Sequence, residues 1–195
     1  MGRDERAIDP ESIYHVTCRG TNGGRIVWDD YDCESFCGQL WRVAETFEWE
    51  VFAWCLMPNH HHVVLRATED HFSDGFHQLN GNHSRRTNRR HGRTDHLFRN
   101  RPKAKELKST AHLISAVAYV VRNPVKAKLV EHAAAWRWSS FRATADLEPA
   151  PAWLLVDEVL ELFGRDVSSA RRALEEYVQI EHALVSGTEE MPAPS

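Results

Sequence analysis

The chain has 195 residues, 42% of them hydrophobic and 27% charged, with a formal net charge of −4. These values are ordinary for a globular protein with a sizeable core, and they exclude a disordered or fibrous chain. No apolar run approaches the roughly 18 residues that cross a bilayer, and the polar start lacks the apolar stretch of a secretory signal, so we expect a cytoplasmic protein with no membrane partner.

The first third of the chain has the patterns of strands and one helix. Residues 13–19 predict a strand, and residues 30–47 carry apolar side chains at helical spacing. Two further strands are expected at 49–57 and 60–65. Pro58-Asn59 between them is a turn signal, so this pair predicts a hairpin.

The rest of the chain is predicted to be mostly helical. A helix through Phe72 and His83 supplies the first arginines at its far end, and residues 96–105 predict a short extended segment. Ser109 or Thr110 caps a helix that should end near Asn123, because the residue before a proline is pushed out of helical geometry. Further helical segments are expected at 124–130, 153–163 and 167–184.

The early strands, separated by helices, predict an α+β fold with an antiparallel sheet. The segment 148–151 (EPAP) marks a boundary. We therefore expect a main domain over residues 11–146, a helical appendage over 147–187 and a disordered tail over 188–195.

A basic block lies in the middle of this acidic chain. From His83 to Lys108 there are ten Lys or Arg residues against two acids, whereas residues 1–50 carry eleven acids against five bases. Such a block is typical of a phosphate-binding face, although a solvated basic helix would have the same composition. The residues expected to bind DNA are Arg85, Arg86, Arg89, Arg90, Arg93, Arg99, Arg101, Lys103 and Lys105.

Three histidines follow the predicted turn. Side chains alternate across a strand, so His60 and His62 share one face, while His61 shares the other with Val63 and Leu65. The two apolar residues mark the core side. The pair His60/His62 is therefore expected to point away from the core, close together, as metal ligands require. Exposed histidines on an edge strand would give the same pattern.

The predicted helix at 110–123 carries a tyrosine on its polar side. On a helical wheel the apolar residues form one stripe, and Tyr119 falls almost opposite it. Asn123 lies one turn later, so the phenol and the carboxamide share a face. A nucleophilic hydroxyl beside an oxygen ligand, able to face a histidine pair, would suit phosphoryl transfer. A surface tyrosine is the alternative.

These residues fall within four collinear segments that resemble the REP-associated tyrosine transposases. This family belongs to the HUH single-strand nucleases and is related to the small insertion-sequence transposases. The resemblance spans about residues 12–145. The segments are 55–62 (CLMPNHHH), 92–103 (GRTDHLFRNRPK), 119–130 (YVVRNPVKAKLV) and 136–143 (WRWSSFRA).

The resemblance implies a ferredoxin-like antiparallel sheet flanked by helices, with the C-terminal helical appendage outside the matching motifs. It implies a metal site of His60, His62 and Asn123, and a nucleophile at Tyr119 that forms a 5′-phosphotyrosine intermediate. Substrates would be single-stranded or hairpin DNA. His61 departs from the family, which has a hydrophobic residue there. Either it is a buried histidine with its hydrogen bonds satisfied or the local strand is twisted; a third ligand fits less well, because His61 faces away from the pair.

The chemistry of the site favours a divalent metal, Mg²⁺ or Mn²⁺, and two imidazoles suit Mn²⁺ better. The predicted function is therefore a metal-dependent single-strand endonuclease and strand transferase. The alternative is a non-catalytic, sequence-specific DNA-binding protein derived from a transposase. Zinc hydrolysis and another HUH role, such as replication initiation, fit the sequence less well. Monomer and homodimer both remain open.

Overall fold

A computed structural model describes residues 8–99 and 101–186. Four strands form one antiparallel sheet in the order β2-β3-β1-β4, which with two helices gives the predicted ferredoxin-like arrangement. The strands are β1 (Tyr14–Arg19), β2 (Glu50–Met57), β3 (His60–Arg66) and β4 (Lys103–Glu106). The helices are α1 (Asp30–Thr46), α2 (Glu69–His91), α3 (Thr110–Lys126), α4 (Phe141–Thr144), α5 (Val156–Glu161) and α6 (Val167–Ser186), with short 3-10 turns η1 (Thr21–Gly23) and η2 (Ala133–Ala135).

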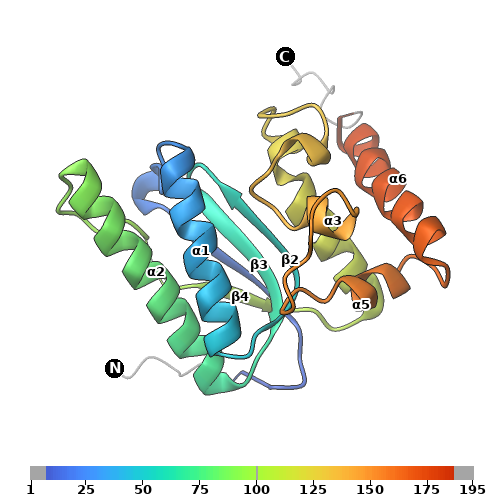
Figure 1. Cartoon of the computed structure of the whole chain (residues 1–195), viewed down its shortest axis with the longest axis horizontal. Helices are drawn as coiled ribbons and strands as arrows, with labels where there is room; N and C mark the ends of the chain where they lie inside the picture. Colours follow the sequence, from blue (N-terminus) through green and yellow to red (C-terminus); the bar gives the residue numbers. More distant parts are fainter. Residues whose placement is uncertain (1–7, 100, 187–195) are drawn as a thin grey trace, which may run out of the picture.

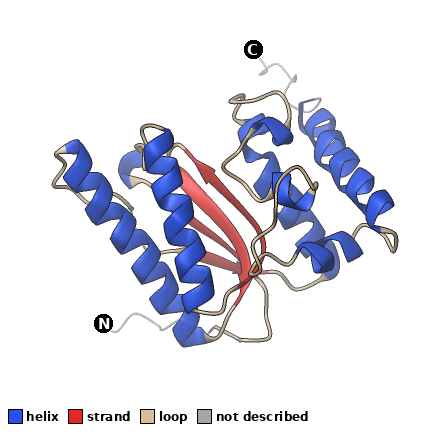
Figure 2. Cartoon of the chain, in the orientation of Figure 1, coloured by secondary structure: helices blue, strands red, loops and turns tan. Residues whose placement is uncertain are grey.

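Helices cover both faces of the sheet (Figures 1 and 2). The first core lies between the sheet and α1 and α2, and the second lies between the sheet and α3, with α6 packed behind α3. Strand alternation explains the division, because neighbouring residues of β3 enter different cores. Val63 and Leu65 belong to the first core, and Val64 belongs to the second.

The ends of the helices follow ordinary capping chemistry. Asp29 accepts a hydrogen bond from the backbone N–H of Asp32 at the start of α1, and Ser109 accepts one from His112 at the start of α3. Gly92 ends α2 in the left-handed conformation, with φ of 63°. The predicted hairpin is confirmed, since Met57 pairs with His60 across a two-residue turn.

The helix α2 packs closely at Gly75 against Trp49, the residue before β2: a Cβ at Gly75 would lie 2.5 Å from Cζ2 of Trp49. The indole is buried and its N–H donates to the carbonyl of His71. Gly75→Ala should therefore lower the free energy of unfolding by about 1–3 kcal/mol. Gly81→Ala, in the same helix with only ordinary contacts, should raise it by up to about 1 kcal/mol. Urea unfolding measures both changes, and a stabilising Gly75→Ala would contradict this packing.

The prediction that the third long helix ends near Asn123 is wrong, because α3 continues through Pro124 to Lys126. Proline cannot donate to the carbonyl of Val120, four residues earlier. The helix persists because the next residue, Val125, is buried in the second core and Ala127 still donates to the carbonyl of Asn123. Tertiary packing therefore outweighs the local preference.

The predicted helix at 153–163 is shorter than expected. Its first residues instead extend along the edge of β2, where Val51 donates to the carbonyl of Trp153 and accepts from the N–H of Leu155. Leu174 and Val178 of α6 then enter the second core beside α3. The division into a domain and an appendage stays a prediction, and the predicted tail at 188–195 lies outside the described residues. No helix in the described part of the chain is long and apolar enough to cross a membrane.

His61 is a buried histidine of the first core, which agrees with the first of the two alternatives expected from the sequence. Its Nε2 lies 2.9 Å from Oδ1 of Asn80, and its ring packs against Phe36, Phe76 and Phe98. Burial lowers the pKa of this imidazole to about 3. His61 therefore lies on the opposite side of the sheet from its two neighbours.

Candidate functional site

His60 and His62 lie on the face of the sheet that α3 covers. The prediction that this face points away from the core is wrong, since the second core lies there and His62 is only 4% exposed. The sequence pattern shows that the two faces of β3 differ, but it does not show what covers each face.

Polar residues of β1 join the pair on this face. Thr17 is paired with His62 and Arg19 with His60 across the antiparallel ladder, and paired residues point to the same side. His15 lies on the same face, with its ring centroid 5.0 Å from that of His62. These three residues were not predicted from the sequence, although their spacing at i, i+2 and i+4 in one strand places them on one face.

Tyr119 of α3 lies against this histidine group. Its ring centroid is 5.7 Å from that of His62 and 5.8 Å from that of His15, in edge-on contacts. The side chain is 37% exposed, so it borders the site while remaining open to solvent. The structure thus brings together the predicted nucleophile and one member of the predicted metal pair.

The nitrogen atoms of the pair fit metal ligation. The ring centroids of His60 and His62 are 4.8 Å apart. Nε2 of His62 is buried and has no hydrogen-bond partner among the described residues. Such a buried polar atom destabilises the fold unless another group binds it. Nδ1 of His60 lies 2.7 Å from Oδ1 of Asn59, which leaves the other nitrogen of His60 for a ligand role.

The electrostatics keep these imidazoles neutral. Burial, and after it the positive charge of Arg19, lowers the pKa of His60 to about 4. Burial lowers the pKa of His62 to about 2, together with the neighbouring imidazoles of His60, His15 and His61 and, least of all, Arg19. Burial and then Lys105 lower the pKa of His15 to about 4. Because a metal ligand needs a free lone pair, neutral imidazoles are in the form that binds a metal at neutral pH.

Asn123 lies one turn after Tyr119 on α3 and is 8% exposed. Its Nδ2 donates to the carbonyl of Tyr119 at 2.8 Å, so Oδ1 is the amide atom left for a cation. No three His, Cys, Asp or Glu side chains in the described chain are arranged to hold a metal. The histidine pair would therefore need an oxygen ligand, from Asn123 or from a bound phosphate.

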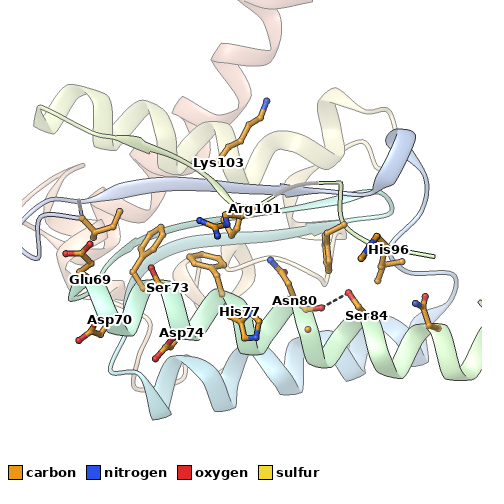
Figure 3. Close-up of a pocket in the computed structure, with 18 of the residues that line it drawn as sticks. Glu69, Asp70, Ser73, Asp74, His77, Asn80, Ser84, His96, Arg101 and Lys103 are labelled. Atoms are coloured by element: carbon orange, nitrogen blue, oxygen red, sulfur yellow. Dashed lines mark hydrogen bonds between the residues drawn. The ribbon is translucent and has the colours of Figure 1, made fainter. Parts of the chain in front are cut away.

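The two lysines of β4 border the same face. Lys105 is paired with His15 and Lys103 with Thr17, and both lysines are exposed. Figure 3 shows Lys103 pointing away from α2. Together with Arg19 they give the histidine face a positive rim, which suits a phosphate backbone.

The arginines of α2 lie near the end of the sheet where β1 ends and β3 begins. Arg90 forms ion pairs with Asp29 and Asp32 at the start of α1, so its charge is largely neutralised within the protein. Arg86 donates to the hydroxyl of Tyr31. The remaining predicted DNA-binding residues on this segment and its continuation are exposed: Arg85, Arg89, Arg93, Arg99 and Arg101.

A pocket of about 1400 Å³ lies on the other face of the sheet, between α2 and the segment that leads into β4 (Figure 3). Ser73, His77, Asn80 and Ser84 of α2 line it, with Arg101 opposite. The described residues that line it include none of the histidine pair, Tyr119 or Asn123. The candidate catalytic and metal-binding residues therefore lie on the α3 face and not in this pocket.

Comparisons with known proteins give one matching family model and several similar solved structures. The model of the family described as IS200-like transposase matches residues 11–123. Among curated proteins, none matches the sequence. A solved structure of a REP-associated tyrosine transposase bound to a REP hairpin is 18% identical, with a TM-score of 0.62 over 86% of this chain and 93% of that chain. This likeness shows a shared fold.

Two other solved structures are less similar. A Deinococcus radiodurans R1 protein to which a transposase function is ascribed is 21% identical, with a TM-score of 0.41 over 63% of this chain and 95% of that chain. The tRNA(His) guanylyltransferase of Saccharomyces cerevisiae is 9% identical, with a TM-score of 0.48 over 90% of this chain and 81% of that chain. These two scores are too low to add to the argument.

Proposed function

The chain belongs to the family of IS200-like transposases, and from this premise we propose that it cuts and rejoins single-stranded DNA at hairpins, with Tyr119 as the nucleophile. The observation that carries the proposal is the contact of a solvent-accessible tyrosine with His62, one member of the histidine pair, on the α3 face. The similar structure that holds a REP hairpin supports hairpin DNA as the substrate class.

The reaction would exchange one phosphoester for another. The phenol oxygen of Tyr119 attacks phosphorus, and the bond from phosphorus to the 3′ oxygen breaks. The products are a 5′-phosphotyrosine and a DNA end with a free 3′ hydroxyl. The phenol proton leaves to solvent, which reaches the ring, and the departing 3′ oxygen takes up a proton from solvent. Attack by a second 3′ hydroxyl reverses the step without ATP.

His60, His62 and Asn123 would hold a divalent metal, Mn²⁺ or Mg²⁺. When bound, such an ion supplies positive charge beside a nonbridging phosphate oxygen, where charge develops during attack. The unpartnered Nε2 of His62 supports this assignment. Tyr119 and His62 meet within one chain, so a single copy would be sufficient for chemistry.

Arg19, Lys103 and Lys105 would bind phosphates beside the scissile bond, because they rim the histidine face. The exposed arginines of α2 and of the following segment would extend this contact at the same end of the sheet. We propose a structural role for Arg90, since two carboxylates already bind its guanidinium.

Because of these basic residues, the affinity for DNA should depend on the salt concentration. Replacing Arg85 and Arg89 by alanine should weaken binding to all DNA sequences and reduce the slope of log affinity against log salt by about 0.7–0.9 for each lost phosphate contact. Filter binding or fluorescence anisotropy at several salt concentrations measures the slope. Arg90→Ala is the matched control: it should lower the melting temperature and leave the slope unchanged. Wild-type affinity that is insensitive to salt would contradict the proposed interface.

The proposed reaction itself is tested with a labelled single-stranded hairpin DNA and Mn²⁺ or Mg²⁺. The protein should cut the strand beside the hairpin and remain joined, after denaturation, to the 5′ phosphate of the fragment downstream of the cut. Fully duplex DNA of the same sequence should stay intact. Hairpin binding without any cleavage would instead favour a non-catalytic DNA-binding protein.

A further inference from the structure

The two ring nitrogens of His62 have different surroundings. Nδ1 lies 2.9 Å from Nε2 of His15 and 3.0 Å from Oγ1 of Thr17, whereas Nε2 is buried and has no partner among the described residues. A neutral imidazole carries its proton on one nitrogen only. The position of that proton decides whether Nε2 can bind a metal.

A proton on Nδ1 satisfies this environment better than a proton on Nε2. On Nδ1 it can be donated to His15 or to Thr17, each of which offers an acceptor atom. On Nε2 it would be a buried N–H with no acceptor, and buried donors of this kind are rare because they lose a hydrogen bond to water.

His60 has the same arrangement with a different partner. Nδ2 of Asn59 donates to the carbonyl of Gly23 at 3.1 Å, which fixes the orientation of the amide. Oδ1 of Asn59 therefore faces Nδ1 of His60 at 2.7 Å. An amide oxygen only accepts hydrogen bonds, so Nδ1 of His60 carries the proton and Nε2 keeps its lone pair.

We infer that His15 and Asn59 are positioning residues, which hold His62 and His60 in the Nδ1-protonated tautomer so that each Nε2 presents a lone pair to a divalent cation. Thr17 acts with His15 on the same nitrogen. Partners of this kind fix the ring orientation of a metal ligand and raise its affinity. The inference rests on the proposed function only in treating the pair as metal ligands.

Nitrogen-15 NMR of the histidine rings in the metal-free protein tests the tautomers directly. In the wild type, His60 and His62 should both carry the proton on Nδ1, and their signals are assigned by the loss of each in His60→Gln and His62→Gln. In His15→Phe combined with Thr17→Val, the Nε2-protonated form of His62 should appear, while His60 is unchanged. Asn59→Ala should change the tautomer of His60 alone. This single variant tests the inference even if the double variant does not fold.

Mn²⁺ binding, followed by electron paramagnetic resonance, gives the second readout. Affinity should fall by about 10–100-fold in the double variant and in Asn59→Ala, and His15→Gln and Asn59→Asp should restore most of it because they keep an acceptor. An Nε2 proton on His62 in the wild type, or tautomers that do not respond to these variants, would overturn the inference. A wild type that binds no Mn²⁺ but shows the expected tautomers would refute the proposed metal and leave the tautomer assignment supported.

Discussion

Tyr119→Phe is expected to reduce strand cleavage by more than about 1000-fold while leaving folding and hairpin binding within about twofold of the wild type. The substitution removes one oxygen and keeps the ring. The edge-on contacts with His15 and His62 therefore persist, and no described hydrogen bond to the phenol is lost. Cleavage rates on a labelled hairpin and its dissociation constant measure the two effects.

Tyr177→Phe is the matched control, because Tyr177 lies on α6 against Phe163 and away from the histidine pair. It should cleave at the wild-type rate. Cleavage that persists in Tyr119→Phe would show that another nucleophile, such as water or a different tyrosine, attacks the phosphate.

Loss of either histidine of the pair should have the second largest effect on strand cleavage, after Tyr119→Phe. His60→Ala and His62→Ala should each abolish detectable Mn²⁺ binding and reduce cleavage by about 100-fold or more, because a bound metal contributes several kcal/mol to transition-state stabilisation. Hairpin binding should change little, since the cations that rim the site remain. EDTA should reproduce this result in the wild type, and added Mn²⁺ should reverse it.

His62 is buried, so its removal can also destabilise the fold. Circular dichroism and thermal unfolding separate the two effects, and His60→Ala, at the less buried position, gives an independent test. His112→Ala, an exposed histidine at the start of α3, is the control and should cleave normally. Full cleavage by both pair variants in the presence of EDTA would refute the metal site.

The sequence indicates which residues of the candidate site share a face, but not what surrounds them. Alternation along β3 separates His61 from its two neighbours, and this is a local property of any strand. The packing of α3 over His60 and His62 depends on contacts between residues far apart in the sequence. The pairing of β1 with β3, which brings His15 and Thr17 to His62, depends on such contacts too. The turn at Pro58-Asn59 predicts that β2 and β3 are neighbours, but local patterns do not show which strands far apart in the sequence pair with each other.

Local rules also failed where tertiary contacts oppose them. The boundary expected at Asn123 rests on the preference of a residue before proline, and burial of Val125 outweighs that preference. Arg90 counts as a basic residue in the sequence, yet Asp29 and Asp32 bind it in the fold. A charge count cannot distinguish an arginine that is free to bind phosphate from one with partners in its own chain.

The most direct test of Tyr119 as the nucleophile is the identity of the residue that becomes joined to DNA. Wild-type protein is incubated with Mn²⁺ and a hairpin strand that is labelled downstream of the cleavage site. The mixture is then denatured, digested with a protease and analysed by mass spectrometry. The labelled nucleotide should map to the peptide that contains Tyr119, with the released DNA end carrying a free 3′ hydroxyl. An adduct on Tyr14, Tyr31 or Tyr177, or cleavage with no adduct at all, would contradict this assignment.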